Sequence, residues 1–204
     1  MTLYNSGKKR YISSIMEKKV LYFEKPGRDN TEECLRVVRE TLKAGGVKHI
    51  VVATTTGETG LAFAGALKSG GANLVVVTHS TGFKEPNTSE LSSETRRKIT
   101  DLGASVYTGS MLTHSIDVAF SGKFSGYSLT QIIANTLRRF GEGPKVCVEC
   151  VMMAVDAGLI PEGEEVLAVA GTARGADSVL LIKSAASKRF LELRVLEILA
   201  KPRV

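Results

Sequence analysis

The chain has 204 residues, of which 43% are hydrophobic and 24% charged, the composition of a globular protein with a substantial core. Its basic residues, which give a net charge of +6, are scattered among acidic ones, so we expect no nucleic-acid-binding surface. No apolar run approaches the roughly 20 residues of a membrane-spanning helix, and residues 1–19 lack the apolar core of a secretory signal.

Strands and helices are expected to alternate through the first half of the chain. Short apolar runs that end in turn residues predict strands at residues 19–23, 49–53, 72–77 and 105–107. Apolar residues at helical spacing, ended by glycines, predict helices between these strands, at residues 30–42, 61–67 and 89–102. Asn30, with Glu33 three residues later, matches the pattern of a helix N-cap.

The middle of the chain is less regular. Residues 108–126 are rich in glycine, serine and threonine and predict a long loop, of a kind that is often functional. Ser128 and Gln131 predict a capping box at the start of a helix that reaches Arg139. Pro144 is expected to open a further, apolar helix.

The last part of the chain favours strands. Residues 165–170 and 178–183 predict two strands joined by the turn 171–177. Residues 190–200 fit either a strand or a helix, and their apolar residues, followed by a proline, favour a strand.

This order of elements predicts an α/β fold. Alternation of strand and helix indicates a mostly parallel, mixed sheet with helices on both faces and right-handed crossovers. The two late strands are expected to add an antiparallel edge. We expect one domain over residues 1–204, with residues 1–18 as an N-terminal extension.

One predicted loop has the composition of an anion site. The carboxyl ends of parallel strands meet at one edge of a sheet, where ligands bind. Thr54–Gly60 follows the second strand and opens a helix, so free backbone N–H groups and the helix dipole favour a phosphate or carboxylate there. An ordinary turn with Thr56 as helix N-cap is the alternative. The loop has neither the Walker pattern nor GxGxxG.

We assign the candidate ligand contacts to loops at this edge of the sheet. Arg174 suits a phosphate and Asp177 suits sugar or polyol hydroxyls, unless the glycines around them form only a hairpin turn. The full set of candidates is Asn30, Thr54, Thr55, Thr56, Gly57, Glu58, Thr59, Gly60, His79, Ser80, Gly82, Phe83, Gly171, Thr172, Arg174, Gly175 and Asp177.

His79 and His114 are the candidate catalytic residues. Each follows a predicted strand at the ligand edge, where an imidazole can move a proton or can be a plain polar loop residue. Cys147 and Cys150 form a CxxC inside an apolar helix, and we expect them to be buried small residues. We expect no metal site, and so few cysteines fit a reducing, cytoplasmic setting.

Several motifs together resemble a known family. The strand–TTTGETG–helix unit followed by VVVTHSTG is similar to the C-terminal, allosteric domain of pyruvate kinase. Nearly the whole chain resembles stand-alone, archaeal-type proteins classed as pyruvate kinase C-terminal-domain-like. The matching stretches, in chain order, are YFEKPGRDNTE, THSTGF, KVCVE, DAGLIP and GTARGAD.

The resemblance implies a three-layer α/β/α sandwich and flavin mononucleotide (FMN) as the cofactor, with its phosphate in the Thr/Gly loop. It implies no reaction, and without a barrel or substrate sites pyruvate kinase activity is not expected. A flavin-binding protein, with a flavin-dependent oxidoreductase left open, is the first hypothesis. The alternative is a non-catalytic regulatory module that binds a sugar phosphate or nucleotide and acts on a partner protein. A homo-oligomer is left open.

Overall fold

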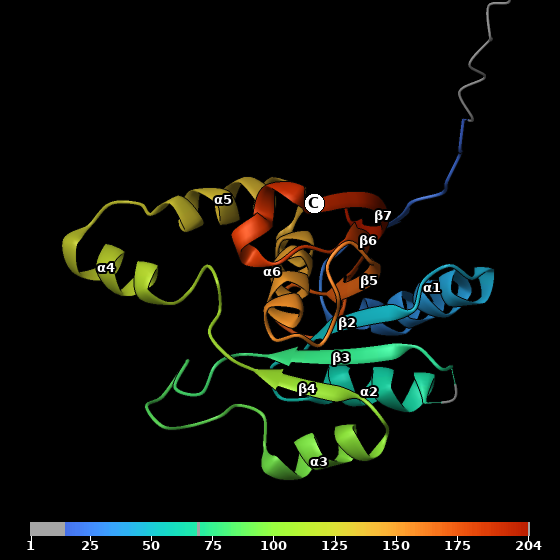
Figure 1. Cartoon of the computed structure of the whole chain (residues 1–204), viewed down its shortest axis with the longest axis horizontal. Coiled ribbons are helices and arrows are strands. Elements are labelled where there is room, and N and C mark those ends of the chain that lie inside the picture. Colours follow the sequence, from blue (N-terminus) through green and yellow to red (C-terminus); the bar gives the residue numbers. More distant parts are fainter. Residues whose placement is uncertain (1–14, 69, 204) are drawn as a thin grey trace, which may run out of the picture.

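The computed structural model describes residues 15–68 and 70–203 (Figure 1). Most of the expected N-terminal extension, residues 1–18, lies outside the described residues. Among the described residues, no helix combines the length and the apolar character needed to cross a bilayer.

Seven strands of the described chain form one sheet in the order β1-β7-β6-β5-β2-β3-β4. All neighbours are parallel except the two pairs that β6 makes, with β5 and β7. The strands are β1 (Leu21–Phe23), β2 (His49–Ala53), β3 (Asn73–Thr78), β4 (Ser105–Thr108), β5 (Glu165–Ala170), β6 (Ser178–Lys183) and β7 (Arg194–Pro202).

The expected antiparallel edge needs correction. β6 is the antiparallel strand, but it lies inside the sheet, because β7 turns back beside it and β1 then pairs in parallel with β7. Both edges of the sheet, β1 and β4, are therefore parallel to their neighbours. The segment left open between strand and helix forms a short 3-10 helix, η3 (Ser187–Glu192), and then β7.

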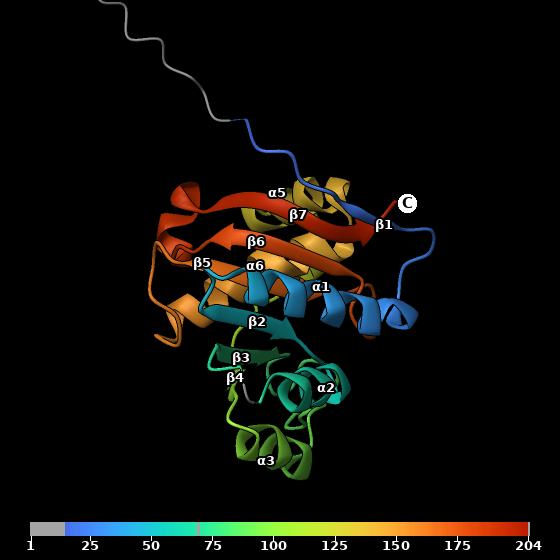
Figure 2. The same ribbon diagram turned by 90° about the vertical axis from the view of Figure 1, so that its right-hand side faces the viewer.

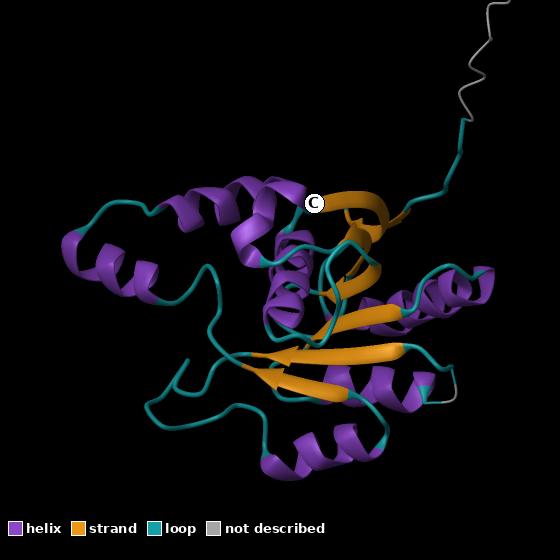
Figure 3. Ribbon diagram, viewed as in Figure 1, coloured by secondary structure: helices purple, strands orange, loops and turns teal. Residues whose placement is uncertain are grey.

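Helices cover both faces of the sheet, as predicted (Figures 2 and 3). Ile50 and Val52 of β2 pack in a cluster with residues of α1 (Thr31–Ala44), α2 (Glu58–Leu67) and α3 (Ser93–Asp101). Val51, between them, points to the other face and packs with α6 (Glu142–Asp156). This alternation is that of a strand buried on both sides, and it makes the three-layer sandwich.

The predicted long loop after β4 contains a helix, α4 (Ile116–Phe124). With α5 (Leu129–Leu137) it forms an arm that projects from the body of the fold (Figure 1). No residue of α4 is buried, although Ile116, Phe120 and Phe124 recur at helical spacing along it. The predicted capping box of α5 is present, with Ser128 and Gln131 bonded reciprocally.

Asn30 does not act as the predicted side-chain cap of α1. Its amide donates to the backbone oxygens of Lys25 and Gly27 and so closes the turn before the helix. A 3-10 turn, η1 (Arg28–Asn30), leads directly into α1, so the chain is already helical at the position where a cap would be extended.

Candidate functional site

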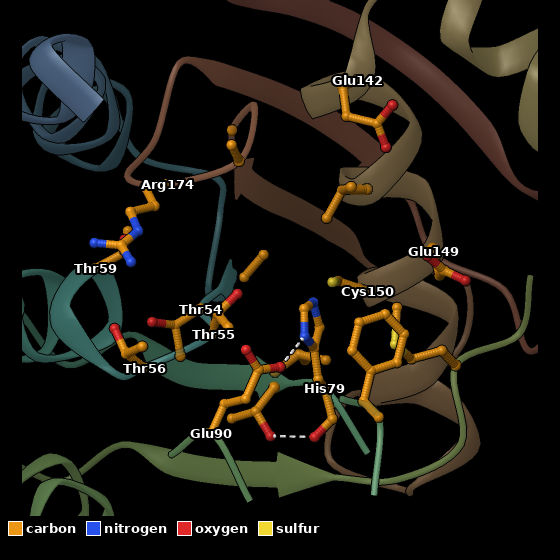
Figure 4. Close-up of a pocket in the computed structure, with 18 of the residues that line it drawn as sticks. Thr54, Thr55, Thr56, Thr59, His79, Glu90, Glu142, Glu149, Cys150 and Arg174 are labelled. Carbon is orange, nitrogen blue, oxygen red and sulfur yellow. Dashed lines mark hydrogen bonds and ion pairs between the residues drawn. The ribbon is translucent and has the colours of Figure 1, made fainter. Parts of the chain in front are cut away.

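A cavity of about 370 Å³ lies at the carboxyl ends of β2 and β3 (Figure 4). The loop Thr54–Thr59, the loop that begins at His79, the turn 171–175 and one side of α6 form its walls. The sequence places the first three of these at the ligand edge, and the structure brings them together there.

The first wall is the start of α2. Thr54 is buried, and its Oγ1 accepts hydrogen bonds from the backbone N–H of Gly57 at 3.2 Å and of Gly60 at 3.4 Å. Thr54 thus takes the capping role that the sequence gives to Thr56. Gly57 has a left-handed φ of 100°, and a Cβ there would lie 2.4 Å from Thr95 Cγ2.

Ligand-binding groups remain at this helix start. The first turn of a helix leaves backbone N–H groups without intrahelical partners, and two of those here are used by Thr54. Thr55, Thr56 and Thr59 line the cavity, and their hydroxyls form no hydrogen bond with other described residues. Together with the helix dipole, this is an anion-binding arrangement.

Thr54→Val is expected to destabilise the protein by about 1–2 kcal/mol, because it removes the acceptor for two backbone N–H groups while keeping the shape of the side chain. Thr56→Ala removes no capping bond and is expected to change stability by less than about 0.5 kcal/mol. Urea unfolding of both variants tests the assignment, and equal losses would contradict it.

The turn 171–175 supplies a cation. Arg174 lines the cavity on the side where α2 begins, and no described residue forms a hydrogen bond or ion pair with its guanidinium (Figure 4). The turn is held tightly: Gly175 has φ 71°, and a Cβ there would lie 2.4 Å from Arg28 Cα. The glycine is thus required by the packing of the turn against η1, and it fixes the backbone beside Arg174.

Asp177 does not line this cavity. Its carboxylate is fully buried and accepts hydrogen bonds from the backbone N–H of Gly27 and Thr172, both at 2.9 Å, and from the Ser178 hydroxyl. It ties the start of the chain to the turn, so the structure gives it a positioning role in place of the expected contact with ligand hydroxyls. The other candidates that do not line the cavity are Asn30, Gly57, Gly60, Ser80, Gly82 and Thr172.

The loop after β3 holds an imidazole in the cavity. His79 Nδ1 lies 2.7 Å from Glu90 Oε2, and Lys84 Nζ lies 2.9 Å from the other oxygen. Burial acts to raise the pKa of Glu90, but the bonds from Lys84 and His79 outweigh it and hold that pKa below its ordinary value. An ionised Glu90 only accepts, so Nδ1 of His79 carries the proton and Nε2 is left for a ligand.

Phe83 and His114 complete an aromatic wall. The ring of Phe83 lies 4.3 Å from that of His79 and 6.3 Å from that of His114, measured between centroids. Both candidate catalytic histidines therefore line the cavity, on either side of one phenylalanine.

The fourth wall, α6, carries cavity-lining residues that the sequence analysis did not identify. Lys145 Nζ and Glu149 Oε2 are 2.6 Å apart, and the two side chains are only 2% and 3% exposed. Glu149 Oε1 also accepts from the backbone N–H and the hydroxyl of Thr113. Lys145 and Glu149 are four residues apart in an otherwise apolar helix, and this spacing could have indicated a buried ion pair. The further lining residues not predicted are Ala53, Val77, Thr78, Lys84, Glu90, Met111, Arg138, Glu142, Val146, Cys150, Met153 and Ala173.

The CxxC is buried, as predicted. Burial raises the pKa of both thiols, that of Cys147 and that of Cys150, so neither is an activated nucleophile. Cys150 contributes an apolar surface to the cavity. Within the described residues, no group of three or more His, Cys, Asp or Glu side chains has the placement of a metal site.

The model of a family described as "Pyruvate kinase, alpha/beta domain" matches residues 32–182, well over half of the chain. A pyruvate kinase from Cryptosporidium parvum is similar at 17% identity and a TM-score of 0.39, covering 74% of this chain and 22% of that one. An O-ureido-L-serine synthase matches at 19% identity and a TM-score of 0.30, covering 50% of this chain and 31% of that one.

A diaminopropionate ammonia lyase from Escherichia coli matches at 16% identity and a TM-score of 0.29, covering 62% of this chain and 37% of the enzyme. The chain thus spans less than half of each of these solved chains. At such scores we infer nothing about function from these three structures.

Proposed function

This chain belongs to the pyruvate kinase alpha/beta domain family, and we propose that its cavity binds a phosphorylated organic ligand, with FMN as the candidate. The observation that carries the proposal is a cavity with two chemically different ends. One end offers hydroxyls, a helix start and an arginine, and the other offers aromatic and apolar side chains.

The first end suits a phosphate. Thr55, Thr56 and Thr59 offer hydroxyl donors, the start of α2 offers backbone N–H groups, and Arg174 offers a planar set of donors without a competing carboxylate partner in the described structure. Such groups recognise a dianion without any metal.

The second end suits a flat heterocycle. Phe83 and the two histidines form one side, and α6 presents Val146, Cys150 and Met153 on another. Ligand cavities combine apolar surface with placed polar groups, and here Glu142, Lys145 and Glu149 of α6 lie beside the apolar side chains. The residues present therefore fit FMN, which supplies hydride or electron transfer when it serves as a cofactor.

A regulatory module that binds a sugar phosphate is the second candidate. Its supporting observation is that Glu58 and Glu142 also line the cavity, because carboxylates suit sugar hydroxyls. The phosphate end of the cavity suits both FMN and a sugar phosphate. The part of the ligand away from the phosphate therefore decides between the two candidates.

Titration of the purified protein with FMN and with riboflavin tests the proposal. We expect the visible spectrum of FMN to change on binding and riboflavin, which lacks the phosphate, to bind at least about tenfold more weakly, since charge-assisted bonds contribute about 1.5–3 kcal/mol. Fructose 1,6-bisphosphate is the competitor, and a larger thermal shift with it than with FMN would favour the regulatory candidate. No spectral change with FMN would exclude the flavin.

Thr55→Val is expected to weaken FMN binding several-fold and leave the affinity for riboflavin and the stability unchanged. The hydroxyl lost belongs to the phosphate end and to no capping bond of the described structure. Parallel titrations and urea unfolding measure these quantities. An equal loss for FMN and riboflavin would place Thr55 outside the phosphate contacts.

A further inference from the structure

A second, open cavity lies along the α4–α5 arm, and the proposed function does not use it. It has a volume of about 520 Å³ and lies between α4, the turn after it and α5. Small and polar side chains line it, among them Ser121, Ser125, Tyr127 and Asn135. The sequence predicts this segment as a long Gly/Ser/Thr loop. Its glycines and serines, among them Ser121 and Ser125, line the cavity.

The second cavity adjoins the first. His114 and Arg138 line both of them. His114 lies just before α4, and Arg138 begins the short η2 (Arg138–Phe140) that links α5 to α6, the fourth wall of the first cavity. A molecule in the second cavity therefore lies next to a ligand in the first.

Arg138 supplies the positive charge of the second cavity, and it is paired with Glu142, which lines the first cavity. Of the described residues that line it, Arg138 is the permanent cation, and none is an aspartate or glutamate. Its guanidinium donates from Nε and Nη2 to Glu142 and from Nη1 to Asn135 Oδ1. A guanidinium has five N–H donors, so one remains on Nη1 and one on Nη2, and both are available to the oxygens of a carboxylate.

His114 offers an acceptor where the cavities meet. The Thr113 hydroxyl donates to the carboxylate of Glu149, so the Thr113 oxygen accepts from His114 Nδ1, 3.1 Å away. Nδ1 then carries the proton, and Nε2 keeps its lone pair. Burial, with the nearby charges of Lys145 and Arg138, lowers the pKa of His114, so the neutral imidazole is the form present at pH 7. A neutral imidazole with a free Nε2 accepts a hydroxyl proton.

We propose that the second cavity binds a small 2-hydroxycarboxylate, with its carboxylate on Arg138 and its hydroxyl donating to His114 Nε2. The lack of acidic lining residues favours an anion, the pair of free guanidinium donors favours a carboxylate, and the imidazole acceptor favours a hydroxyl on the neighbouring carbon. Its placement beside a phosphorylated ligand rests on the proposed function, whereas the binding itself does not.

The test is an NMR titration of isotope-labelled protein with lactate, followed through the imidazole signals of His114, both without and with FMN. Lactamide, which lacks the charge, and acetate, which lacks the hydroxyl, are the matched probes. We expect lactate to shift the His114 signals and to bind at least tenfold more tightly than either probe. No shift with lactate, or equal binding of the three compounds, overturns the proposal.

Two neighbouring arginines supply the matched variants. Arg138→Met is expected to weaken lactate binding at least tenfold, whereas Arg139→Met, on an exposed residue outside the cavity, leaves it unchanged. Arg138→Lys keeps the charge but not the two-donor geometry, and an intermediate loss is expected. Should Arg138→Met fail to fold, the lysine variant decides, and wild-type affinity in it overturns the assignment. Lactate binding to a protein that does not bind FMN would defeat the proposed function alone.

Discussion

Glu149→Met is expected to lower the free energy of unfolding by about 3–5 kcal/mol, because it leaves the ammonium of Lys145 buried without its counter-charge. The Thr113 hydroxyl and backbone N–H lose their acceptor in the same change. Urea unfolding at pH 7 measures the loss. The melting temperature should fall by roughly 2–4 °C for each kcal/mol lost in a chain of this size.

The double variant Lys145→Met with Glu149→Met tests whether the unpaired charge of Lys145 causes the loss of stability. Removing both charges also removes the cost of desolvating them, so we expect most of the lost stability to return. Glu142→Met, which breaks the more exposed pair between Glu142 of α6 and Arg138 of η2, is the control and should cost about 0–1 kcal/mol. A double variant as unstable as the single one would show that the ion pair is not the cause.

The same pair gives a pH dependence with a definite sign. Burial acts to raise the pKa of Glu149, but Lys145 and Thr113 outweigh it and hold that pKa below its ordinary value of 4.5. A carboxyl with a lower pKa in the folded state adds stability above its unfolded pKa and loses it as the pH falls through the folded one. Below about pH 4.5, the wild type should therefore lose stability more steeply than the double variant.

The sheet could be predicted because its strands are marked locally. The runs 49–53, 165–170 and 178–183 are apolar and bounded by polar or turn residues, and β2, β5 and β6 have these bounds. The place of β6 inside the sheet depends on how β7 and β1 pair with each other across almost the whole chain. No local pattern encodes such a pairing, so the antiparallel strand was wrongly expected at an edge.

The parts of the candidate site that could be predicted are those whose residue types indicate their chemistry. Hydroxyls and glycines after two neighbouring strands indicate Thr54–Thr59 and the loop that begins at His79. Hydrogen-bond partners that are distant in the sequence cannot be predicted in this way. Asp177 is next to Arg174 in the turn and looks available, yet it is turned inward to the backbone of Gly27, 150 residues earlier. Glu90, which orients His79, lies in an exposed loop without any periodicity.

The helix α4 was missed for a different reason. The sequence of α4 has apolar residues four apart, but the glycines and serines around them favour a loop, and none of the residues in α4 is buried. Ile116, Phe120 and Phe124 are instead exposed on the arm. Hydrogen bonds to α5 and the α5 capping box hold α4 in place, whereas α5 itself packs against the core through Leu137.

Arg174→Met is expected to weaken FMN binding by roughly 10–100-fold, which corresponds to a lost charge-assisted contact of about 1.5–3 kcal/mol. The effect is large because no carboxylate of the described structure neutralises this guanidinium, so its full donor set is available to a phosphate. The methionine keeps much of the unbranched stem, and the turn keeps its backbone through Gly175 and Asp177. Stability should change by less than about 0.5 kcal/mol.

Fluorescence titration with FMN and riboflavin measures whether Arg174 contacts the phosphate. The variant should bind the two flavins with nearly the same affinity, because the residue that distinguishes them has been removed. Arg139→Met has the same change in net charge at an exposed position outside the cavity, and it should keep the preference for FMN. If Arg174→Met and Arg139→Met lose the same amount of affinity for FMN, the effect comes from long-range charge, and the phosphate must bind elsewhere. If neither loses affinity, the start of α2 alone holds the phosphate, and the hydroxyls of its three threonines become the determinants of binding.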